Sequence, residues 1–164
     1  MQIKYLGDGK VEIKTKDATI LLGQHVIIND FVLPGPGEYE KSGIFVEGIS
    51  DRNNTIYLIK AEEINVCYLG TISCDLAEDK TKEIGDIDIL FVPLGQKESQ
   101  EIKKATDLVS KIDPKIVIPI LFDDQRLTDF KKSEGITDDV LDVLKIKKSE
   151  LPENERRNVI LKAS

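Results

Sequence analysis

The sequence predicts an α/β or α+β domain in which a two-layer β core is covered by helices. The first half of the chain is a succession of short apolar segments separated by turn residues. The second half contains two almost continuous apolar runs with an amphipathic segment between them. A chain of 164 residues suits one domain with a core of its own, so we expect a single domain over 1–164.

The first half predicts strands that end at Gly, Pro, Asn or Asp. We expect them at 2–7, 10–15, 18–23, 25–33, 44–49, 55–61 and 64–70. Val11 and Ile13 alternate with Glu12 and Lys14, so this strand has one wet face. The Gly- and Pro-rich segment 34–43 is expected to be a loop, because Pro removes a ladder hydrogen bond. Short connections make antiparallel neighbours the natural arrangement.

The second half predicts a βαβ unit. Residues 86–95 (DIDILFVPLG) and 115–122 (KIVIPILF) are apolar enough to be strands buried on both faces. Between them, 99–112 carries Ile102 and Val109 among its apolar residues at helical spacing. The crossover of such a unit is right-handed.

The C-terminal part predicts a short helix and a last strand. The helix is expected within 123–135 and ends near Gly135, and the strand covers 157–163. Residues 136–146 mix helical periodicity with strand-forming residues, so the sequence leaves their structure open.

Composition argues against a nucleic-acid partner and against a membrane-spanning segment. The 30 acidic and 23 basic residues give a formal charge of −7, which disfavours nucleic acid because Lys and Arg supply most non-specific affinity for phosphates. The apolar runs are far shorter than the roughly 20 residues of a membrane helix. The N-terminus lacks the layout of a signal peptide. We therefore expect a cytoplasmic protein with no nucleic-acid partner and no membrane contact.

The cysteines and the single histidine do not form a recognisable zinc motif. Structural zinc needs three or four protein ligands, and Cys67 and Cys74 are too far apart for a zinc knuckle. Cys67 falls inside an expected strand as a small hydrophobe, whereas Cys74 lies past the strand end, where a side chain can be exposed. We interpret them as two free thiols and His25 as a structural histidine.

Seven segments follow one another in an order that resembles the small metal-dependent hydrolases of the metallo-β-lactamase fold. They are MQIKYLG, IKTKDATIL, GPGEYE, TIYLIKAEEINVCYLG, IGDIDILFVPLG, ATDLVSKIDPKIVIPI and LKIKKSELPE. The resemblance extends from residue 1 to about 161. It implies an αββα sandwich, here shortened: two mixed sheets face each other, helices lie outside, and the active site lies where the strand ends converge.

The resemblance also marks where the family's metal ligands would be, and this chain departs at each position. Relatives carry a His after the first YLG, an Asp that bridges two metals after the strand 64–70, and a last His after IVIPI. This chain has Asp8, Thr71 and Leu121 there, which makes them positions of a vestigial site. The His-x-His-x-Asp-His loop is missing, because the chain runs from ATILLG almost directly into GPGEYE.

These departures imply that the hydrolase chemistry is lost. A zinc site lowers the pKa of water from about 15.7 to about 7, on the order of 12 kcal/mol of activation. A side-chain base supplies only about 3 to 5 kcal/mol. We expect no catalytic residue, no metal ligand and no cofactor. The implied function is that of a pseudoenzyme, a non-catalytic binding or assembly module or a structural subunit of a larger complex.

The alternative is an enzyme with a rebuilt site, either an acid-only metal site or a metal-free hydrolase. Carboxylates and water can hold Mg²⁺ or Ca²⁺ without histidine. Asp75, Asp123 and Asp124 are the weak candidates for such a site, because the fold would bring them near Asp8 at the strand ends.

The missing loop also has a consequence for assembly. In the relatives this loop and the helix behind it cover part of a sheet face. Without them an apolar patch or an edge strand is expected to be open, and such patches are used for association. We expect a homodimer contact or a protein partner at the uncovered face.

Overall fold

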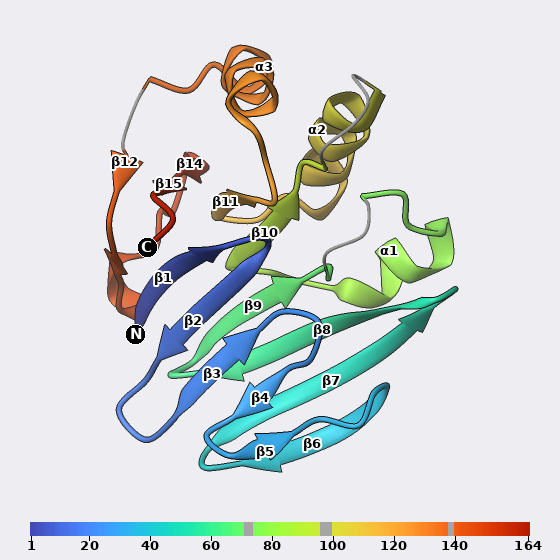
Figure 1. Ribbon diagram of the computed structural model, residues 1–164, viewed down its shortest axis with the longest axis vertical. Helices are drawn as coiled ribbons and strands as arrows, with labels where there is room; N and C mark the ends of the chain where they lie inside the picture. The colour runs from blue at the N-terminus through green and yellow to red at the C-terminus, as the bar shows by residue number, and fades with distance from the viewer. Residues whose placement is uncertain (71–73, 96–99, 138–139) are drawn as a thin grey trace.

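Two β-sheets packed face to face form the protein, with the α-helices outside them (Figure 1). The computed structural model describes residues 1–70, 74–95, 100–137 and 140–164. None of the described helices is long and apolar enough to cross a membrane.

The first sheet, sheet A, is antiparallel and has the strand order β13-β1-β2-β3-β4-β5. Its strands are β1 (Gln2–Gly7), β2 (Lys10–Lys14), β3 (Thr19–Leu22), β4 (Ile27–Ile28), β5 (Phe31–Val32) and β13 (Leu144–Lys145). The three strands expected within 2–23 are confirmed. The single strand expected over 25–33 is wrong, because Asn29 adopts a left-handed φ of 55° and turns the chain back as the β4–β5 hairpin.

The second sheet, sheet B, is mixed and has the order β14-β11-β10-β9-β8-β7-β6. Its strands are β6 (Gly37–Lys41), β7 (Ile44–Asp51), β8 (Asn54–Ala61), β9 (Ile64–Tyr68), β10 (Ile89–Pro93), β11 (Ile116–Ile120) and β14 (Arg157–Asn158). Strands β6 to β9 are antiparallel neighbours, as expected, and β9, β10, β11 and β14 are parallel.

The expectation that 34–43 contains no strand is wrong. Pro34 and Pro36 lie before β6, so neither interrupts its pairing with β7. β6 forms one edge of sheet B and carries the charged residues Glu38, Glu40 and Lys41, a composition that edge strands tolerate.

The expected helices are present, and one further helix was missed. α2 (Gln100–Ile112) and α3 (Asp124–Glu134) confirm the two expected helices, and α3 ends at Gly135 with a left-handed φ of 65°. α1 (Glu78–Ile84) is mostly charged and buries only Ile84, so its sequence lacks an apolar stripe.

The C-terminal part is more divided than expected. The open question about 136–146 is answered by two short strands, β12 (Val140–Leu141) and β13. The expected strand over 157–163 is split into β14 and β15 (Ile160–Leu161), because β14 pairs with β11 whereas β15 pairs with β12. A 3-10 helix, η1 (Lys148–Glu150), lies between β13 and β14.

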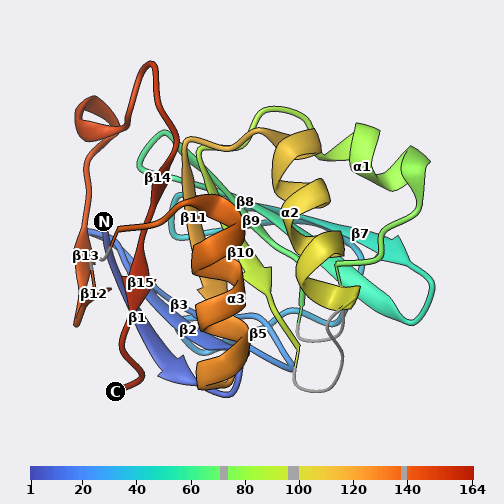
Figure 2. The same ribbon diagram turned by 90° about the horizontal axis from the view of Figure 1, so that it is seen from above.

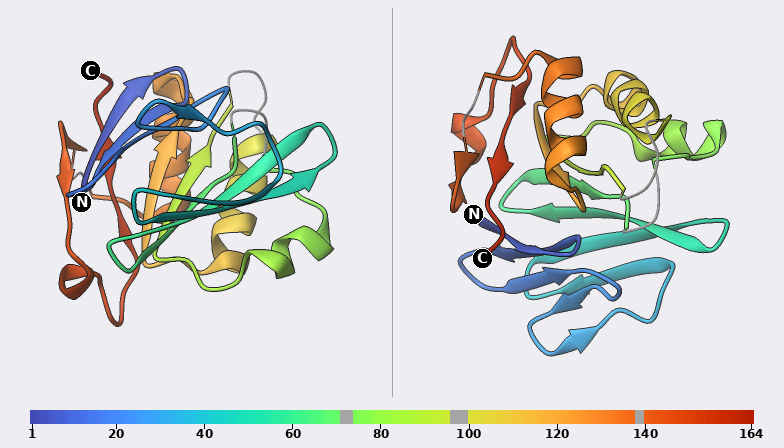
Figure 3. Two further views of the ribbon diagram at one scale, coloured as in Figure 1. Left: turned by 90° about the horizontal axis from the view of Figure 1, so that it is seen from below. Right: turned by 45° about the horizontal axis from the view of Figure 1, so that its top comes forward.

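The buried apolar side chains form two layers, one between the two sheets and one between sheet B and the helices. Ile89 and Phe91 of β10 point into the layer between the sheets, whereas Leu90 and Val92 point into the layer under the helices. The second layer includes buried side chains of α1, α2 and α3, so all three pack on the outer face of sheet B (Figures 2 and 3). The predicted sandwich is thus confirmed in its two facing sheets and outer helices, and the described residues place no α-helix on the outer face of sheet A.

Asp88 connects the amino ends of the central strands. Its buried carboxylate accepts a hydrogen bond from the Asn65 N–H of β9 at 2.9 Å. The Lys115 Nζ before β11 lies 2.9 Å from Oδ1, and the Lys148 Nζ of η1 lies 2.8 Å from Oδ2. Burial alone would raise the pKa of Asp88, but these three donors outweigh burial and hold the pKa below its ordinary value of 3.8.

We predict that Asp88→Asn lowers the free energy of unfolding by about 1 to 3 kcal/mol at pH 7, because charge-assisted hydrogen bonds to both lysines are lost. Since the folded-state pKa is depressed, the carboxylate stabilises the fold above pH 3.8, and that stabilisation disappears as the pH falls through the folded-state pKa. Urea unfolding from pH 7 down to pH 2 measures both effects. The exposed Asp86→Asn is the matched control, and an equal effect of the two substitutions would contradict this role.

Candidate functional site

Two turns at one edge of the sandwich bring together two positions of the expected vestigial site. Asp8 lies in the β1–β2 turn and Leu121 follows β11. The phenolic oxygen of Tyr5 accepts a hydrogen bond from the Gly9 N–H at 3.3 Å and from the Leu121 N–H at 3.0 Å. One buried side chain therefore holds both turns in place.

A second buried tyrosine, Tyr68, also forms a hydrogen bond to the β1–β2 turn. The Tyr68 hydroxyl donates a hydrogen bond to the Gly9 carbonyl oxygen at 3.1 Å. Burial raises the pKa of Tyr68, and the neighbouring Tyr5 and Tyr57 raise it further, so the phenol stays protonated at neutral pH and can donate. The Tyr5 ring lies 5.7 Å from that of Phe122, centroid to centroid. Aromatic side chains thus fill the space between these strand ends.

The sequence analysis missed both tyrosines, although a signal for them exists. Each opens a Tyr-Leu-Gly triplet at the end of a strand, residues 5–7 and 68–70. The glycines that close the triplets have left-handed φ angles, 88° at Gly7 and 81° at Gly70. The repeated triplet therefore marks two strands that end alike, with the tyrosine two residues before the turn.

The end of β9 is shaped by Gly70. The Asn54 Nδ2 donates to the Leu69 carbonyl at 2.7 Å, and a Cβ on Gly70 would lie 2.5 Å from the Asn54 Oδ1. Only glycine fits this position without rearrangement. Thr71, the next residue and the third position of the expected vestigial site, lies outside the described residues.

Leu121 has an unusual backbone. Its φ of 51° is left-handed, which costs a residue with a Cβ roughly 1 to 2 kcal/mol. The surrounding structure holds this conformation through the Tyr5 hydrogen bond to the Leu121 N–H. The chain thus makes a sharp turn where the resemblance places a histidine, but the side chain there has no ligand atom.

The weak acidic candidates are engaged elsewhere. Asp123 caps α3 by accepting a hydrogen bond from the Arg126 N–H at 2.8 Å. Asp75 lies 3.4 Å from the Lys104 Nζ and 3.8 Å from Arg52 Nη1. Asp124 lies exposed in the first turn of α3, where its negative charge interacts favourably with the helix dipole.

The side chains described by the structure do not fit the metal that the fold family implies. Among the described residues, no three His, Cys, Asp or Glu side chains are grouped closely enough to hold a metal ion. Asp8 and His25 are both exposed, and His25 lies in the connection from β3 to β4. A leucine and one exposed carboxylate cannot replace the histidine-rich ligand set of a zinc site.

Both cysteines are buried. Burial raises the pKa of the Cys67 thiol, which keeps it protonated. Cys74 is also buried, so its expected exposure is wrong: the Sγ lies 3.1 Å from the Pro93 carbonyl oxygen, within hydrogen-bonding distance.

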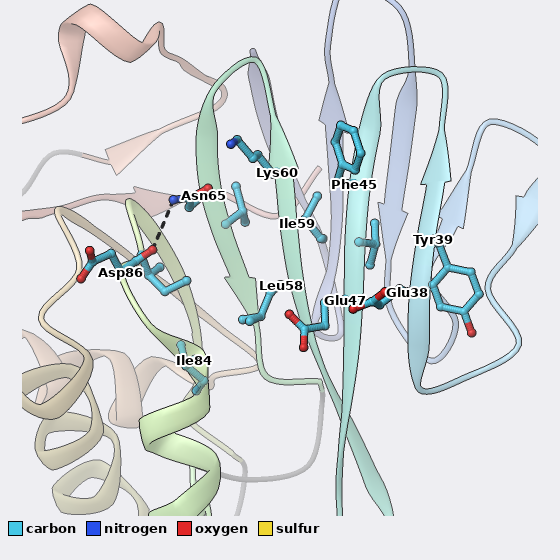
Figure 4. A pocket seen from close by; sticks show the side chains of 13 residues that line it. Glu38, Tyr39, Phe45, Glu47, Leu58, Ile59, Lys60, Asn65, Ile84 and Asp86 are labelled. Atoms are coloured by element: carbon cyan, nitrogen blue, oxygen red, sulfur yellow. Dashed lines mark hydrogen bonds between the residues drawn. The ribbon is translucent and has the colours of Figure 1, made fainter.

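The described surface includes a pocket at the strand ends and a groove on sheet B. A strand-end pocket of about 340 Å³ is bordered by Asp8, Phe122, Val140 and Lys162. Its walls are mostly apolar, and it offers one carboxylate and one ammonium group. A larger groove of about 390 Å³ lies on the outer face of sheet B, between β6–β8 and the end of α1 (Figure 4).

Comparison with known proteins places the chain in a family. Residues 16–121 match the model of the β-lactamase superfamily domain. No curated protein matches the chain in sequence.

Solved structures share the fold. A candidate zinc-dependent hydrolase of the metallo-β-lactamase superfamily from Thermotoga maritima has a TM-score of 0.82 at 23% identity, over 98% of both chains. A candidate metal-dependent hydrolase from Parabacteroides distasonis has a TM-score of 0.67 at 13% identity, over 97% of this chain and 91% of that one. The metallo hydrolase Igni18 from Ignicoccus hospitalis has a TM-score of 0.63 at 9% identity, over 89% of this chain and 99% of that one.

We predict that Tyr5→Phe lowers the free energy of unfolding by about 1 to 3 kcal/mol, because the N–H groups of Gly9 and Leu121 lose their acceptor. Tyr39→Phe is the control, since the half-buried Tyr39 hydroxyl only donates to loop carbonyls such as that of Gly35. Chemical denaturation of both variants measures the difference. Equal losses would show that the Tyr5 hydroxyl has no special role.

A second prediction concerns the backbone at Leu121. Leu121→Gly is expected to be more stable than Leu121→Ala by about 1 kcal/mol, because both remove the side chain and only alanine keeps a Cβ at positive φ. Thermal unfolding of the two variants gives the comparison. A more stable alanine variant would mean that the left-handed turn is absent in solution.

Proposed function

The chain belongs to the β-lactamase superfamily and has the fold of its metal-dependent hydrolases, and we propose that it is a non-catalytic member of this superfamily that works by binding another protein chain. The family match covers residues 16–121, and the fold extends over nearly the whole chain. Fold alone does not carry activity, which depends on the side chains at the site.

One observation carries the proposal: the strand-end turns are joined by tyrosine hydroxyls. The resemblance implies that Asp8 and Leu121 stand where relatives carry metal ligands. Tyr5 accepts hydrogen bonds from the Leu121 N–H and from the N–H of Gly9, the residue after Asp8. In a metal-dependent hydrolase, ligand side chains from several strand ends bind the same cation. The shared cation holds these strand ends together. Here two buried phenols link the β1–β2 turn to the ends of β9 and β11, so this edge can stay ordered without a cation.

The binding role is supported by exposed apolar residues on sheet A. Phe31 and Val32 of the edge strand β5 are 41% and 48% exposed. They lie in the short segment where, by the resemblance, relatives have their ligand loop. Val32 is the cross-strand partner of Ile27, which in turn pairs with Leu21, so the outer face of sheet A presents a row of three apolar side chains. Phe31 pairs with the buried Ile28 and therefore points to the other side of β5, at the open edge of the sheet. We propose this outer face together with the β5 edge as the contact for a second copy or for a protein partner.

Metal content tests the proposal most directly. The protein is purified after growth with added zinc, manganese and iron, and its metals are measured by plasma mass spectrometry. We expect far less than one metal ion per chain and no hydrolysis of phosphodiester, ester or lactam substrates. Stoichiometric metal, or turnover that is lost on chelation, would replace the proposal with the alternative of a rebuilt hydrolase site.

The contact face has its own test. Light scattering after size exclusion, over a range of protein concentrations, measures self-association. We expect a dimer or larger species that becomes monomeric in the double variant Phe31→Ser/Val32→Ser. Leu6→Ser is the control, because Leu6 is also an exposed apolar residue of sheet A, on β1. A monomer at every concentration would leave only a heterologous partner for this face.

A further inference from the structure

The groove on the outer face of sheet B arises where the helical layer ends. α1, α2 and α3 cover the outer face around β9 to β11. Beyond the end of α1 at Ile84, the outward faces of β6, β7 and β8 border a groove of about 390 Å³ (Figure 4). This volume is in the range of sites that bind small molecules or peptide side chains.

The centre of the groove is apolar. Phe45 of β7 is 51% exposed, and the half-buried Leu58 of β8 lies diagonally across from it on the same face, opposite Glu47. Ile84, the last residue of α1, and Ile87, in the connection from α1 to β10, form the wall on the helix side. An aromatic side chain that is half exposed at a concave surface is typical of a binding anchor.

The β6 side of the groove is acidic. Glu38 of β6 is the direct cross-strand partner of Glu47 of β7, and Figure 4 shows their side chains next to each other. Both are exposed, and neither has an ion-pair partner among the described residues. Like charges directly opposite each other destabilise a sheet. The folded protein therefore keeps an unfavourable pair at this position that an incoming cation would relieve.

The groove also contains one base and one further acid. Lys60 of β8 is the direct cross-strand partner of Phe45, and Asp86 lies on the α1 side. The Asn65 Nδ2 donates to the Asp86 carbonyl oxygen at 3.3 Å, which ties the α1–β10 connection to β9. The groove is therefore lined by three carboxylates and one ammonium group. Two of the carboxylates, Glu38 and Glu47, form the like-charge pair next to Phe45.

We propose that this groove binds a segment of a partner protein in which a lysine or arginine lies next to a large apolar side chain. The apolar side chain packs between Phe45 and Leu58, and the cation lies between Glu38 and Glu47. Charge complementarity favours such a partner over a second copy, because this chain carries a formal charge of −7. The groove lies on the helix side of sheet B, away from β5, so the inference holds whether or not the strand-end edge is catalytic.

Two synthetic heptapeptides test the inference. One alternates lysine with leucine and phenylalanine, and the other has glutamate in place of each lysine. Fluorescence anisotropy measures binding to the intact protein, and amide chemical shifts locate the contact. We expect the lysine peptide to bind and to shift the amides of Glu38, Glu47 and Leu58, with weaker binding at higher salt. Equal binding of the two peptides, or shifts centred elsewhere, would overturn the inference.

A charge-neutralising double variant gives a sharper result. Glu38→Gln/Glu47→Gln keeps the side-chain shape and is expected to weaken binding of the lysine peptide about tenfold. The same variant is expected to raise Tm by about 1 to 3 °C, because the like-charge pair is removed. A merely structural pair would not give lower affinity together with higher stability. Unchanged affinity, or a lower Tm, would contradict the proposed role of the pair.

The matched control removes the same charge elsewhere. Glu153→Gln/Glu155→Gln changes two exposed carboxylates in the segment before β14. We expect peptide affinity within about twofold of the original protein. An equal loss in both double variants would mean that net charge, not the groove, attracts the peptide. Phe45→Ala tests the apolar half of the site and is expected to weaken binding with no change in the salt dependence.

Discussion

The rest of the structure depends on covering both faces of sheet B. Every residue of β10 and β11 is buried, so these strands need apolar partners on both sides. Sheet A covers one side and the helices cover the other, which makes two apolar layers. Burial of apolar surface contributes roughly 25 cal/mol per Å², so this double coverage is the main source of stability. Asp88 aligns the same strands at their amino ends by binding the Asn65 N–H and two lysine side chains.

The surface features follow from where this coverage stops. Strands β6 to β8 extend past the helices, and their outward side chains are left to form the acidic and apolar groove. At the strand ends the buried rings of Tyr5 and Tyr68 continue the layer between the sheets, and their hydroxyls satisfy the turn backbone that would otherwise be unpaired. One edge of the fold is thus closed by side chains of its own core, whereas the outward side of β6 to β8 in sheet B is left uncovered by the helices.

A scaffold of this kind separates fold from chemistry. The superfamily fold requires two facing sheets and a helical layer, and this chain retains them. Metal-dependent reactivity depends on ligand atoms at a few strand ends, whereas the fold depends on the apolar layers. Because the layers are independent of those few side chains, the same fold is compatible with the non-catalytic binding role that we propose.

The sequence by itself determined the βαβ unit, the antiparallel strands 44–49, 55–61 and 64–70, and the superfamily, since periodicity and motif order are local properties of the chain. Only the tertiary structure decided that 25–33 forms a hairpin and that β6 exists as an edge strand, because a left-handed Asn29 and pairing with β7 decide them. It also decided the pairing of Glu38 with Glu47 and the contact of Tyr5 with Leu121. These contacts depend on strand register and on residues 116 positions apart, and no local pattern encodes them.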